Sequence, residues 1–391
     1  MGKKVIIKNI DVIYTMGGEG TRVNASIVIE NGKIKEITSK IEGRDNNTEV
    51  IDGSGLIALP GLIDPCTHIG VYPLEWEYGE HGVEKSDPVT PHLAVIDGLD
   101  LFDKAFDDAV RGGITTIGVH PGSYMSFGSV LEHMTIIPGQ VAILKTNRKI
   151  LFENHGIVLA LGEHVKRYLK EQKLSPTTRM GIVAAIRALF NNAIDYKKRK
   201  ISEEKVPIDL KLEAIIKLLE DKLVAYIHAH TSRDIRTLIG LLNEYGVKRK
   251  ILVHGTEAHM VPDLLKEYNI PVILGPIIFS KRGVELRNLD SNIPLLLYNN
   301  GVLFSLTTDH PTIPIQYLSL IASVAVGEGL PREEALKAIT INAARIIGID
   351  ANLGSLEPGK DADIVLFDRD PLDPQTKVVY TIIDGEIAYS R

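Results

Sequence analysis

Residues 57–68 read IALPGLIDPCTH, an apolar run that is entered through Pro60-Gly61 and ends in two metal-capable side chains, Cys66 and His68. Residues two apart on a β-strand share one face, so the Cys66 thiolate and the His68 imidazole can hold the same cation. The stretch therefore predicts a buried strand with the beginning of a metal site at its carboxyl end.

Metal-capable or acidic side chains also follow three later apolar stretches: His228 and His230 after residues 224–227, His254 after residues 251–253, and Asp309 with His310 after residues 302–308. A lone histidine at a strand end is more often structural, but independent structural histidines have no reason to fall repeatedly at that point. A parallel barrel brings all of its carboxyl strand ends to one mouth, so we expect these side chains to surround a single site.

The composition bounds the class of protein. The 391 residues are 44% hydrophobic and 24% charged, which predicts one large domain with a smaller appendage. The net charge of −6 and the lack of a long basic run argue against nucleic acid as a partner. Without a signal-peptide pattern or about 18 uninterrupted apolar residues, we expect a cytoplasmic protein with no membrane partner. Cys66 is the single cysteine, so an intrachain disulfide is excluded and the thiol stays available to a metal.

Both ends of the chain show the alternation typical of β-strands. Asn31-Gly32 and Asp384-Gly385, dipeptides that favour two-residue hairpins, each separate two such stretches. Neither end has enough apolar surface to fold alone, so we expect residues 1–58 and 352–391 to join in one small composite β-sandwich.

Residues 59–351 alternate strands with amphipathic helices, which predicts an α/β fold with a (β/α)8 TIM barrel. The apolar spacing indicates a helix over residues 102–110 that stops at Gly112-Gly113, and a strand over residues 114–119. A last helix is expected over residues 334–347, closed by Gly348.

Six segments carry a resemblance to a known family: residues 60–64 (PGLID), 84–91 (EKSDPVTP), 227–230 (IHAH), 254–258 (HGTEA), 308–311 (TDHP) and 354–363 (GSLEPGKDAD). With them the chain resembles the amidohydrolase superfamily and, within it, the imidazolonepropionase-related amidohydrolases, over nearly its full length. The resemblance implies a metal-dependent hydrolase of carbon–nitrogen bonds, built as a barrel whose termini form a composite β-sandwich.

By this resemblance, the metal ligands fall on five residues: Cys66, His68, His228, His254 and Asp309. Two positions depart from the family's pattern, since the family has His where this chain has Cys66, and the lysine that bridges two metals in many relatives falls at about Val158. Glu163 is the nearest acidic residue that could act as a ligand instead. One metal held by Glu163, His228 and His254 is a second arrangement.

Zinc is the expected metal, because Zn²⁺ accepts thiolate, imidazole and carboxylate donors together. One ion is expected, and a second stays open. A thiolate donates more charge than an imidazole, so a water bound to this metal should be less acidic and activity should be lower or shifted to higher pH. The alternative for Cys66 is that it fills a small buried space while His68 binds the metal alone.

Amide hydrolysis requires a nucleophile, an oxyanion stabiliser and a proton donor, and bound zinc can provide the first two. The resemblance makes Asp309 the catalytic base that passes the water proton to the leaving group. His230 is the second catalytic candidate because it should also face the mouth; its alternative is a hydrogen bonder behind the ligands. His310, at the alternate position beside Pro311, should face away.

The expected substrate is a small molecule with a non-nucleobase amide bond: a cyclic amide or imidazolone-like ring, an N-acyl amino acid or a dipeptide. Superfamily members that deaminate nucleobases carry Glu where this chain has Thr231. The candidate substrate-binding residues are Lys145, which matches a family lysine, Arg179, Arg233, and Trp76 in the loop after the first metal strand. For the arginines a solvated surface role, and for the loop a packed lid, are the alternatives.

The rival interpretation is a barrel that has lost catalysis and serves as a binding or scaffold protein, motivated by Cys66 and Val158. Bound metal and chelator-sensitive turnover would separate the two classes. The sequence leaves the oligomeric state open, although barrels of this kind often form homo-oligomers.

Overall fold

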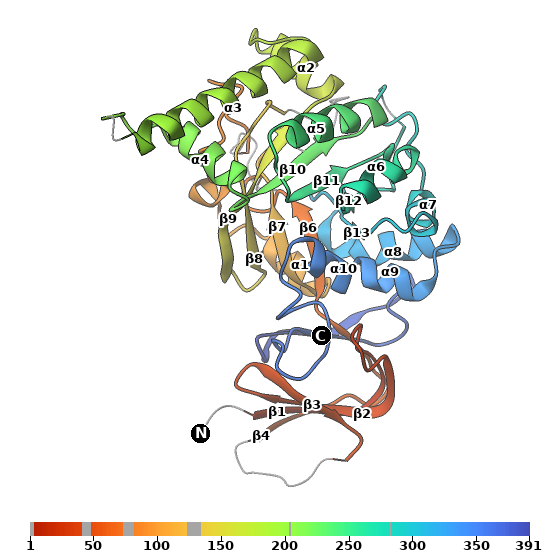
Figure 1. Ribbon diagram of the computed structural model, residues 1–391. Helices are drawn as coiled ribbons and strands as arrows, with labels where there is room; N and C mark the ends of the chain where they lie inside the picture. Colours follow the sequence, from red (N-terminus) through yellow and green to blue (C-terminus); the bar gives the residue numbers. More distant parts are fainter. Residues whose placement is uncertain (1–3, 41–47, 73–81, 123–133, 203–204, 282) are drawn as a thin grey trace.

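Strands from both ends of the chain form one sheet in the computed structural model, which describes residues 4–40, 48–72, 82–122, 134–202, 205–281 and 283–391 (Figure 1). Its strands are β1 (Lys4–Tyr14), β2 (Thr21–Glu30), β3 (Lys33–Thr38), β4 (Thr48–Asp52), β5 (Ile57–Pro60), β14 (Ile364–Phe367), β15 (Val378–Ile383) and β16 (Glu386–Ser390). β5 connects the two contributions, because it pairs in parallel with β1 and antiparallel with β14. The predicted union of both termini is confirmed, whereas the domain boundaries at residues 58 and 352 stay predictions.

The two predicted hairpin turns of this sheet lie against each other. Asn31 and Gly32 have φ of 54° and 76°, and Asp384 and Gly385 have φ of 51° and 76°, the left-handed values that a two-residue hairpin turn requires. A Cβ atom on Gly32 would come within 2.7 Å of the Asp384 carbonyl oxygen, so the close packing of the turns depends on glycine. This contact joins the N-terminal and C-terminal parts of the sheet.

The second sheet is an eight-stranded barrel of β6 (Leu62–Thr67), β7 (Ile114–Val119), β8 (Gln140–Lys145), β9 (Ile150–Ala160), β10 (Val224–Ala229), β11 (Lys250–His254), β12 (Val272–Leu274) and β13 (Phe304–Leu306). β6 and β7 are parallel, and so are β9 to β13. Its two edges meet where the His68 amide donates to the His310 carbonyl oxygen (2.8 Å) and the Thr308 amide donates to Asp64 Oδ2 (3.1 Å). The predicted α/β barrel is confirmed.

β8 departs from a strict (β/α)8 repeat, because it runs antiparallel to both β7 and β9. Residues 146–149 alone connect β8 to β9, whereas a parallel crossover needs about a dozen residues. The last residue of β8, Lys145, therefore pairs with Thr116 near the beginning of β7. It lies at the end of the barrel opposite the mouth.

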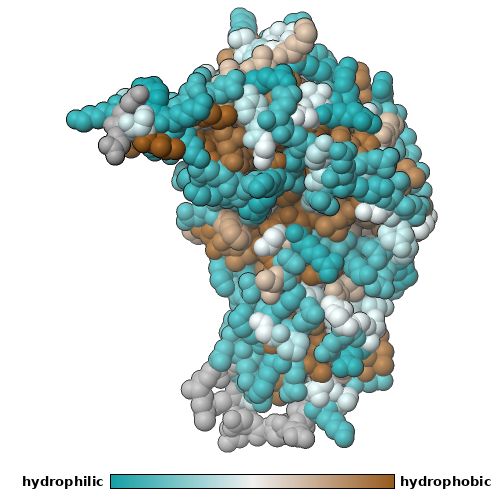
Figure 2. Space-filling view, viewed as in Figure 1, coloured by the Kyte–Doolittle hydropathy of each residue, from teal (hydrophilic) through white to brown (hydrophobic). Residues whose placement is uncertain are grey.

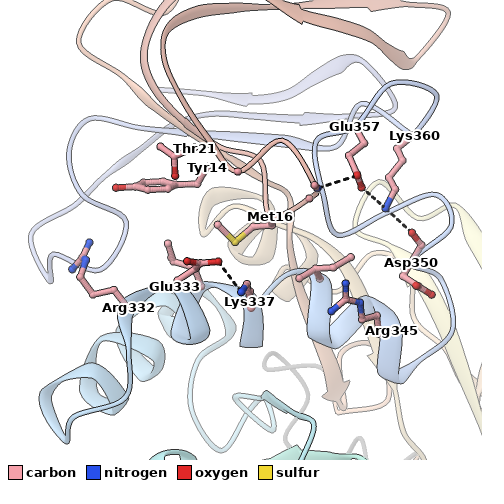
Figure 3. Close-up of a pocket in the computed structure, with 15 residues that line it drawn as sticks. Tyr14, Met16, Thr21, Arg332, Glu333, Lys337, Arg345, Asp350, Glu357 and Lys360 are labelled. Carbon is pink, nitrogen blue, oxygen red and sulfur yellow. Dashed lines mark hydrogen bonds and ion pairs between the residues drawn. The ribbon is translucent and has the colours of Figure 1, made fainter. Parts of the chain in front are cut away.

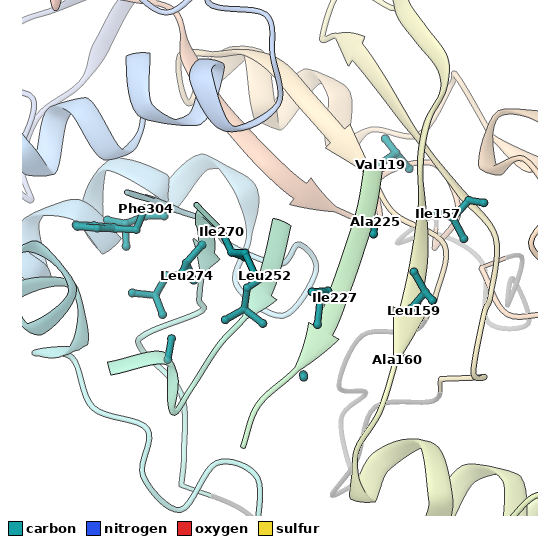
Figure 4. Close-up of a cluster of buried hydrophobic side chains, with 14 of the residues drawn as sticks. Val119, Ile157, Leu159, Ala160, Ala225, Ile227, Leu252, Ile270, Leu274 and Phe304 are labelled. Atoms are coloured by element: carbon teal, nitrogen blue, oxygen red, sulfur yellow. The ribbon is translucent and has the colours of Figure 1, made fainter. Parts of the chain in front are cut away.

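Helices surround the barrel: α1 (Ala105–Arg111), α2 (Glu163–Glu171), α3 (Arg179–Ile201), α4 (Leu210–Leu219), α5 (Ser232–Glu244), α6 (Pro262–Glu267), α7 (Ile293–Asn299), α8 (Leu318–Gly327), α9 (Arg332–Ala338) and α10 (Ile341–Ile346), with short 3-10 turns at Val95–Gly98, Ala258–Met260 and Ile315–Tyr317. The helix predicted over residues 102–110 exists as α1 but begins only at Ala105, and Phe102, which was expected in its apolar stripe, lies before it and is exposed. Figure 4 shows part of the buried apolar layer of the barrel, with Ile157, Ile227 and Leu252 contributed by three neighbouring strands.

The single helix predicted over residues 334–347 is wrong, since α9 ends before Ile339 and α10 begins after Thr340. Thr340 has a non-helical backbone (φ −137°, ψ −102°), and its hydroxyl donates to the Leu336 carbonyl oxygen (2.6 Å). The Ile63 amide, near the beginning of β6, donates to the carbonyl oxygen of Ile339 (2.9 Å). The break thus lets α10 pack against β6, where Ala343 shares a buried cluster with Ile63.

Hydrophilic residues cover most of the face shown in Figure 2, including the projecting arm that α3 and α4 form. The last turn of α3 carries Lys198, Arg199 and Lys200, cations that favour the negative end of a helix. Within the described ranges, no helix combines the length and the apolar character needed to cross a membrane.

His155 provides a test of how the barrel responds to pH. Its Nδ1 atom lies 2.7 Å from the buried Tyr226 hydroxyl, and burial, with the charge of Arg249, lowers the pKa of His155 to about 4. The unfolded chain, with a pKa near 6.5, therefore binds this proton first as the pH falls. We expect the free energy of unfolding to drop on this account by up to ~1.4 kcal/mol per pH unit between about pH 6.5 and 4.

His155→Gln should remove this part of the drop in the free energy of unfolding at acidic pH. The glutamine still offers Tyr226 a hydrogen-bonding partner. Urea unfolding at pH 7 and pH 5 measures the difference. An equal decrease in the free energy of unfolding from pH 7 to pH 5 in both proteins would contradict the role given to His155.

Candidate metal centre

Three donor atoms converge at the carboxyl ends of the barrel strands. The Cys66 sulfur, a ring nitrogen of His254 and a carboxylate oxygen of Asp309 lie within 4.8 Å of one another, and all three side chains are buried. Asp309 Oδ1 is 4.0 Å from the Cys66 sulfur, 4.0 Å from His254 Nε2 and 3.4 Å from His68 Nε2. The structure thus brings three of the six predicted ligands to one point and places a fourth, His68, against Asp309. They are contributed by β6 and the residue after it, by β11 and by the segment after β13.

Hydrogen bonds to backbone carbonyls orient two of the imidazoles. His68 Nδ1 donates to the carbonyl oxygen of His120 (2.9 Å), and His254 Nδ1 donates to that of Gly275 (2.7 Å). Because a carbonyl oxygen can only accept, these bonds place the ring proton on Nδ1 and direct the Nε2 lone pair toward Asp309. A neutral imidazole in this tautomer is the form that binds a metal ion.

The backbone is held in unusual conformations at the centre. His254 has φ of 66° and Asp309 has φ of 52°, left-handed values that residues other than glycine rarely adopt. The Asp309 amide donates to the Thr307 hydroxyl oxygen (3.1 Å), and the Asp309 Oδ2 atom accepts from the Thr312 hydroxyl (2.9 Å). Such strain persists where the surrounding structure fixes side chains for function.

Asp64 fastens the end of β6 to the segment after β13. Its fully buried carboxylate lies 2.5 Å from the hydroxyl oxygens of both Thr307 and Thr308. Burial raises the pKa of Asp64 to about 6, while the hydrogen bonds from the threonines oppose the rise. The carboxylate thereby fixes the relative positions of Cys66 and Asp309.

The donor set fits a zinc ion in spacing and chemistry. In a tetrahedral zinc site with bonds of about 2.0–2.3 Å, neighbouring ligand atoms are about 3.3–3.8 Å apart. Of the separations around Asp309, the one of 3.4 Å lies within this range and the two of 4.0 Å lie slightly above it. Sulfur, nitrogen and oxygen donors together form a set that zinc accepts.

His228 and His230 stand beside the centre. The ring of His228 lies 4.4 Å from that of His254 between centroids, and the ring of His230 stacks on His254 at 5.0 Å and 16°. His230 Nδ1 is 2.9 Å from the Thr256 hydroxyl oxygen. Both histidines therefore line the mouth of the barrel next to a predicted ligand.

The predicted ligand role of Glu163 is wrong, and with it the arrangement that joins Glu163 to His228 and His254. The Glu163 carboxylate is 39% exposed and bonds to Lys166 (2.8 Å) and Arg179 (3.3 Å). These two cations, Lys166 first, lower the pKa of Glu163. Glu163, the first residue of α2, is thus paired with two cations and is absent from the group of donors at Asp309.

The next residue, His164, points inward instead. Its Nδ1 atom is 2.9 Å from both carboxylate oxygens of Glu285, and its ring lies 5.0 Å from that of His228 and 5.7 Å from that of His230. Glu285 also accepts from the first two amides of α2 (2.8 and 3.0 Å), where negative charge is favoured. A Cβ atom at Gly162 would lie 2.1 Å from Glu285 Oε1, so this carboxylate fits because residue 162 is glycine.

His164 and His120 are site residues that the sequence-based predictions missed. They follow the apolar strands β9 and β7, so the pattern that selected His254 also applies to them. His120 Nε2 is 3.1 Å from the Pro65 carbonyl oxygen, and burial, with the nearby His68, lowers the pKa of His120 well below its usual value.

The predicted substrate contact of Lys145 is wrong, because the antiparallel β8 carries this residue to the barrel end that faces the terminal sheet. Its fully buried ammonium bonds to Asp361 (3.0 Å), Asp363 (2.9 Å) and Asp384 (2.5 Å). Burial lowers the pKa of Lys145, but the three carboxylates outweigh it and raise the pKa above its usual value. Lys145 is therefore a structural cation between the barrel and the terminal sheet.

The other predicted substrate-binding residues have protein partners or lie outside the description. Arg179 makes a bidentate pair with the buried Asp234 (2.6 and 2.9 Å), which ties α3 to α5. Arg233 is 65% exposed and lies 3.6 Å from the same carboxylate. Trp76 falls outside the described residues. Substrate contacts of these three residues stay predictions.

Residues 57–388 match the model of the amidohydrolase family. A crystal structure of an amidohydrolase from Thermotoga maritima aligns with a TM-score of 0.91 and 32% identity, covering 99% of this chain and 100% of that one. The amidohydrolase tasK of Hapsidospora irregularis is 26% identical over 390 residues, 92% of this chain and 39% of that longer protein. The imidazolonepropionase of Idiomarina loihiensis is 26% identical over 379 residues, 90% of this chain and 87% of its own. The chain therefore belongs to the amidohydrolase family, enzymes that hydrolyse carbon–nitrogen bonds and generally bind divalent metal ions.

Proposed function

We propose that the protein uses one zinc ion, held by Cys66, His68, His254 and Asp309 with His228 beside them, to hydrolyse a small non-nucleobase amide. The convergence of Asp309 Oδ1 with Cys66, His68 and His254, within 3.4–4.0 Å, is the observation that carries this proposal. The substrate would be a cyclic amide or imidazolone-like ring, an N-acyl amino acid or a dipeptide; the name imidazolonepropionase of one relative favours the ring.

Val158 supports a single metal rather than a pair. Its side chain is buried in the same apolar cluster as Cys66, on the strand where the resemblance implies a bridging lysine in many relatives. A valine offers no donor atom, so this wall of the barrel cannot bridge two ions.

Asp309 would act as the general base. Its Oδ2 atom is held by the Thr312 hydroxyl, and its Oδ1 atom faces His68 and His254. The Asp309 carboxylate would take a proton from the attacking water and deliver it to the departing nitrogen. When bound, zinc would supply a water of lowered pKa and polarise the amide carbonyl. His230, whose Nδ1 meets Thr256, would direct Nε2 to the substrate oxygen.

Thr231 supports an amide rather than a nucleobase amine as the substrate. Its hydroxyl lies 2.8 Å from Asp234 Oδ2, and it caps the beginning of α5. No acid stands at this position to protonate a ring. A small apolar hollow that includes Leu274 and Phe279 borders His254, and would contact an uncharged part of the substrate.

Metal analysis of the purified protein, followed by turnover assays, tests the proposal. The assays would use cyclic ureides, imidazolone-like rings, N-acyl amino acids and dipeptides, before and after treatment with a chelator. We expect about one zinc per chain and turnover that the chelator removes and zinc restores. A protein without stoichiometric metal, or with turnover indifferent to the chelator, would contradict the proposal.

Changes at Cys66 test whether the thiolate binds the metal. Cys66→His should retain or increase zinc occupancy, because imidazole is an equally suitable ligand. Cys66→Ala should weaken zinc binding by at least about tenfold, since even residues behind the ligands contribute that much. Competition with a zinc-binding dye measures both affinities, with Val158→Ala as the matched change in the same apolar cluster. Unchanged affinity in Cys66→Ala would leave only the space-filling role.

A further inference from the structure

A cavity of about 700 Å³ lies between the terminal sheet and the barrel, and none of its lining residues belongs to the metal centre (Figure 3). One wall comes from the end of β1, the start of β2 and the segment that joins them, including Tyr14, Met16 and Thr21. The facing wall comes from α9, α10 and the segment 350–360 that returns the chain to the sheet. Small-molecule sites typically enclose about 300–1,000 Å³ and often lie between domains.

Hydrogen bonds and a close glycine contact hold the rim of this cavity in place. The Gly18 amide donates to Glu357 Oε1 (3.3 Å), and Glu357 also accepts from the Ser355 hydroxyl (2.5 Å). A Cβ atom on Gly17 would lie 2.5 Å from the Glu357 carboxyl carbon, so the loop approaches this side chain closely because it carries glycine. Lys360 donates to the Asp350 backbone carbonyl (2.6 Å) and so holds the two ends of segment 350–360 together.

Most charges around the cavity are already neutralised by protein partners: Arg332 by Asp370, Lys337 by Glu333 (2.7 Å) and Glu334 (3.0 Å), and Lys360 by Glu357 (3.2 Å). Two lining residues differ from these. Neither the Arg345 guanidinium nor the Asp350 carboxylate has an ion pair among the described residues. The cavity therefore offers one cation and one anion with which a ligand can form ion pairs.

Arg345 and Asp350 lie at the same end of the cavity, on α10 and just after it (Figure 3). The other part of the lining includes the Tyr14 ring, Met16 and Leu336, which is 2% exposed. A ligand that pairs with both charges and also contacts the Tyr14, Met16 and Leu336 part carries a carboxylate and an ammonium group next to each other, with an apolar extension. We propose that this cavity binds a zwitterionic α-amino acid with an apolar side chain, its carboxylate on Arg345 and its ammonium on Asp350.

Calorimetric titration of the full, metal-loaded protein tests this site with L-phenylalanine as the probe. N-acetyl-L-phenylalanine lacks the ammonium charge, and L-phenylalaninamide lacks the carboxylate. We expect saturable binding of L-phenylalanine, and binding at least about tenfold weaker for each derivative, because each loses one charged partner. Arg345→Gln and Asp350→Asn should each weaken L-phenylalanine binding by a similar factor.

Matched variants separate this site from the metal centre and from general effects of charge. Arg236→Gln and Asp263→Asn change exposed charges that do not line the cavity and should leave binding unaltered. Asp309→Asn should also bind normally, because Asp309 lies outside the cavity. Thr21→Trp should fill the cavity and abolish binding, whereas Arg22→Trp, on the other face of β2, should not. Circular dichroism confirms that each variant is folded.

Three results would overturn the proposal. They are no saturable binding of L-phenylalanine up to about 10 mM, equal binding of either derivative, and binding that survives in both Arg345→Gln and Asp350→Asn. Binding lost in Asp309→Asn and retained in Thr21→Trp would place the amino acid at the metal centre, which also rejects this site.

Discussion

Asp309→Asn should lower kcat/KM by on the order of 10²–10⁴-fold while leaving the fold intact. The substitution keeps the shape of the side chain and its contact with the Thr312 hydroxyl, but an amide cannot take a proton from water at neutral pH. It also removes the charged oxygen that lies 3.4 Å from His68. Steady-state kinetics on the best substrate from the screen, together with thermal unfolding and zinc content, measure the effect.

A comparison with Thr312→Val distinguishes loss of the base from loss of its orientation. Thr312→Val removes the hydroxyl that holds Oδ2 and keeps the carboxylate, so its rate should fall far less than that of Asp309→Asn. A folded, zinc-loaded Asp309→Asn enzyme with the original rate would show that another group moves the proton.

Lys145→Met should destabilise the protein by about 3–5 kcal/mol, the cost typical of leaving buried charges without their partner. Methionine has nearly the shape of the lysine side chain, so the loss would arise mainly from the carboxylates of Asp361, Asp363 and Asp384. All three carboxylates belong to the terminal sheet and its connections, so removing Lys145 takes away the barrel cation that they share. Urea unfolding, followed by circular dichroism, measures the change.

Lys149→Met is the matched control for this prediction. Lys149 reaches the same Asp384 carboxylate at 3.0 Å, but its side chain is 55% exposed. Exposed pairs contribute at most about 1 kcal/mol, so this variant should be nearly as stable as the original protein. Equal stability of Lys145→Met and Lys149→Met would show that the buried cluster does not hold the two parts together.

The barrel and much of its centre could be predicted because their signals are local. A short apolar run that ends in His254, or that precedes Asp309 by three residues, predicts both the strand and the functional side chain at its carboxyl end. The same local rule covers His120, which directly follows β7, and His164, which lies four residues after β9. Whether residue 163 or 164 faces inward depends on how α2 begins against Glu285, more than 120 positions away.

The role of Lys145 could not be read in this way. Its position depends on the direction of β8, and that direction follows from the short connection between Lys145 and Ile150. The partner Asp384 lies 239 positions further along the chain, and no spacing within one segment reports such a contact. Long-range ion clusters of this kind require the assembled fold.

The sheet shared by both termini has a consequence for synthesis on the ribosome. β5 emerges early, but its antiparallel neighbour β14 is translated about 300 residues later. While the barrel is being synthesised, one edge of β5 therefore has no neighbouring strand, and the apolar side of β1 is incompletely covered. Unpaired strand edges invite association between nascent chains. Premature termination before Ile364 should therefore yield aggregated product rather than a working barrel, and chaperone demand should be highest just before translation ends.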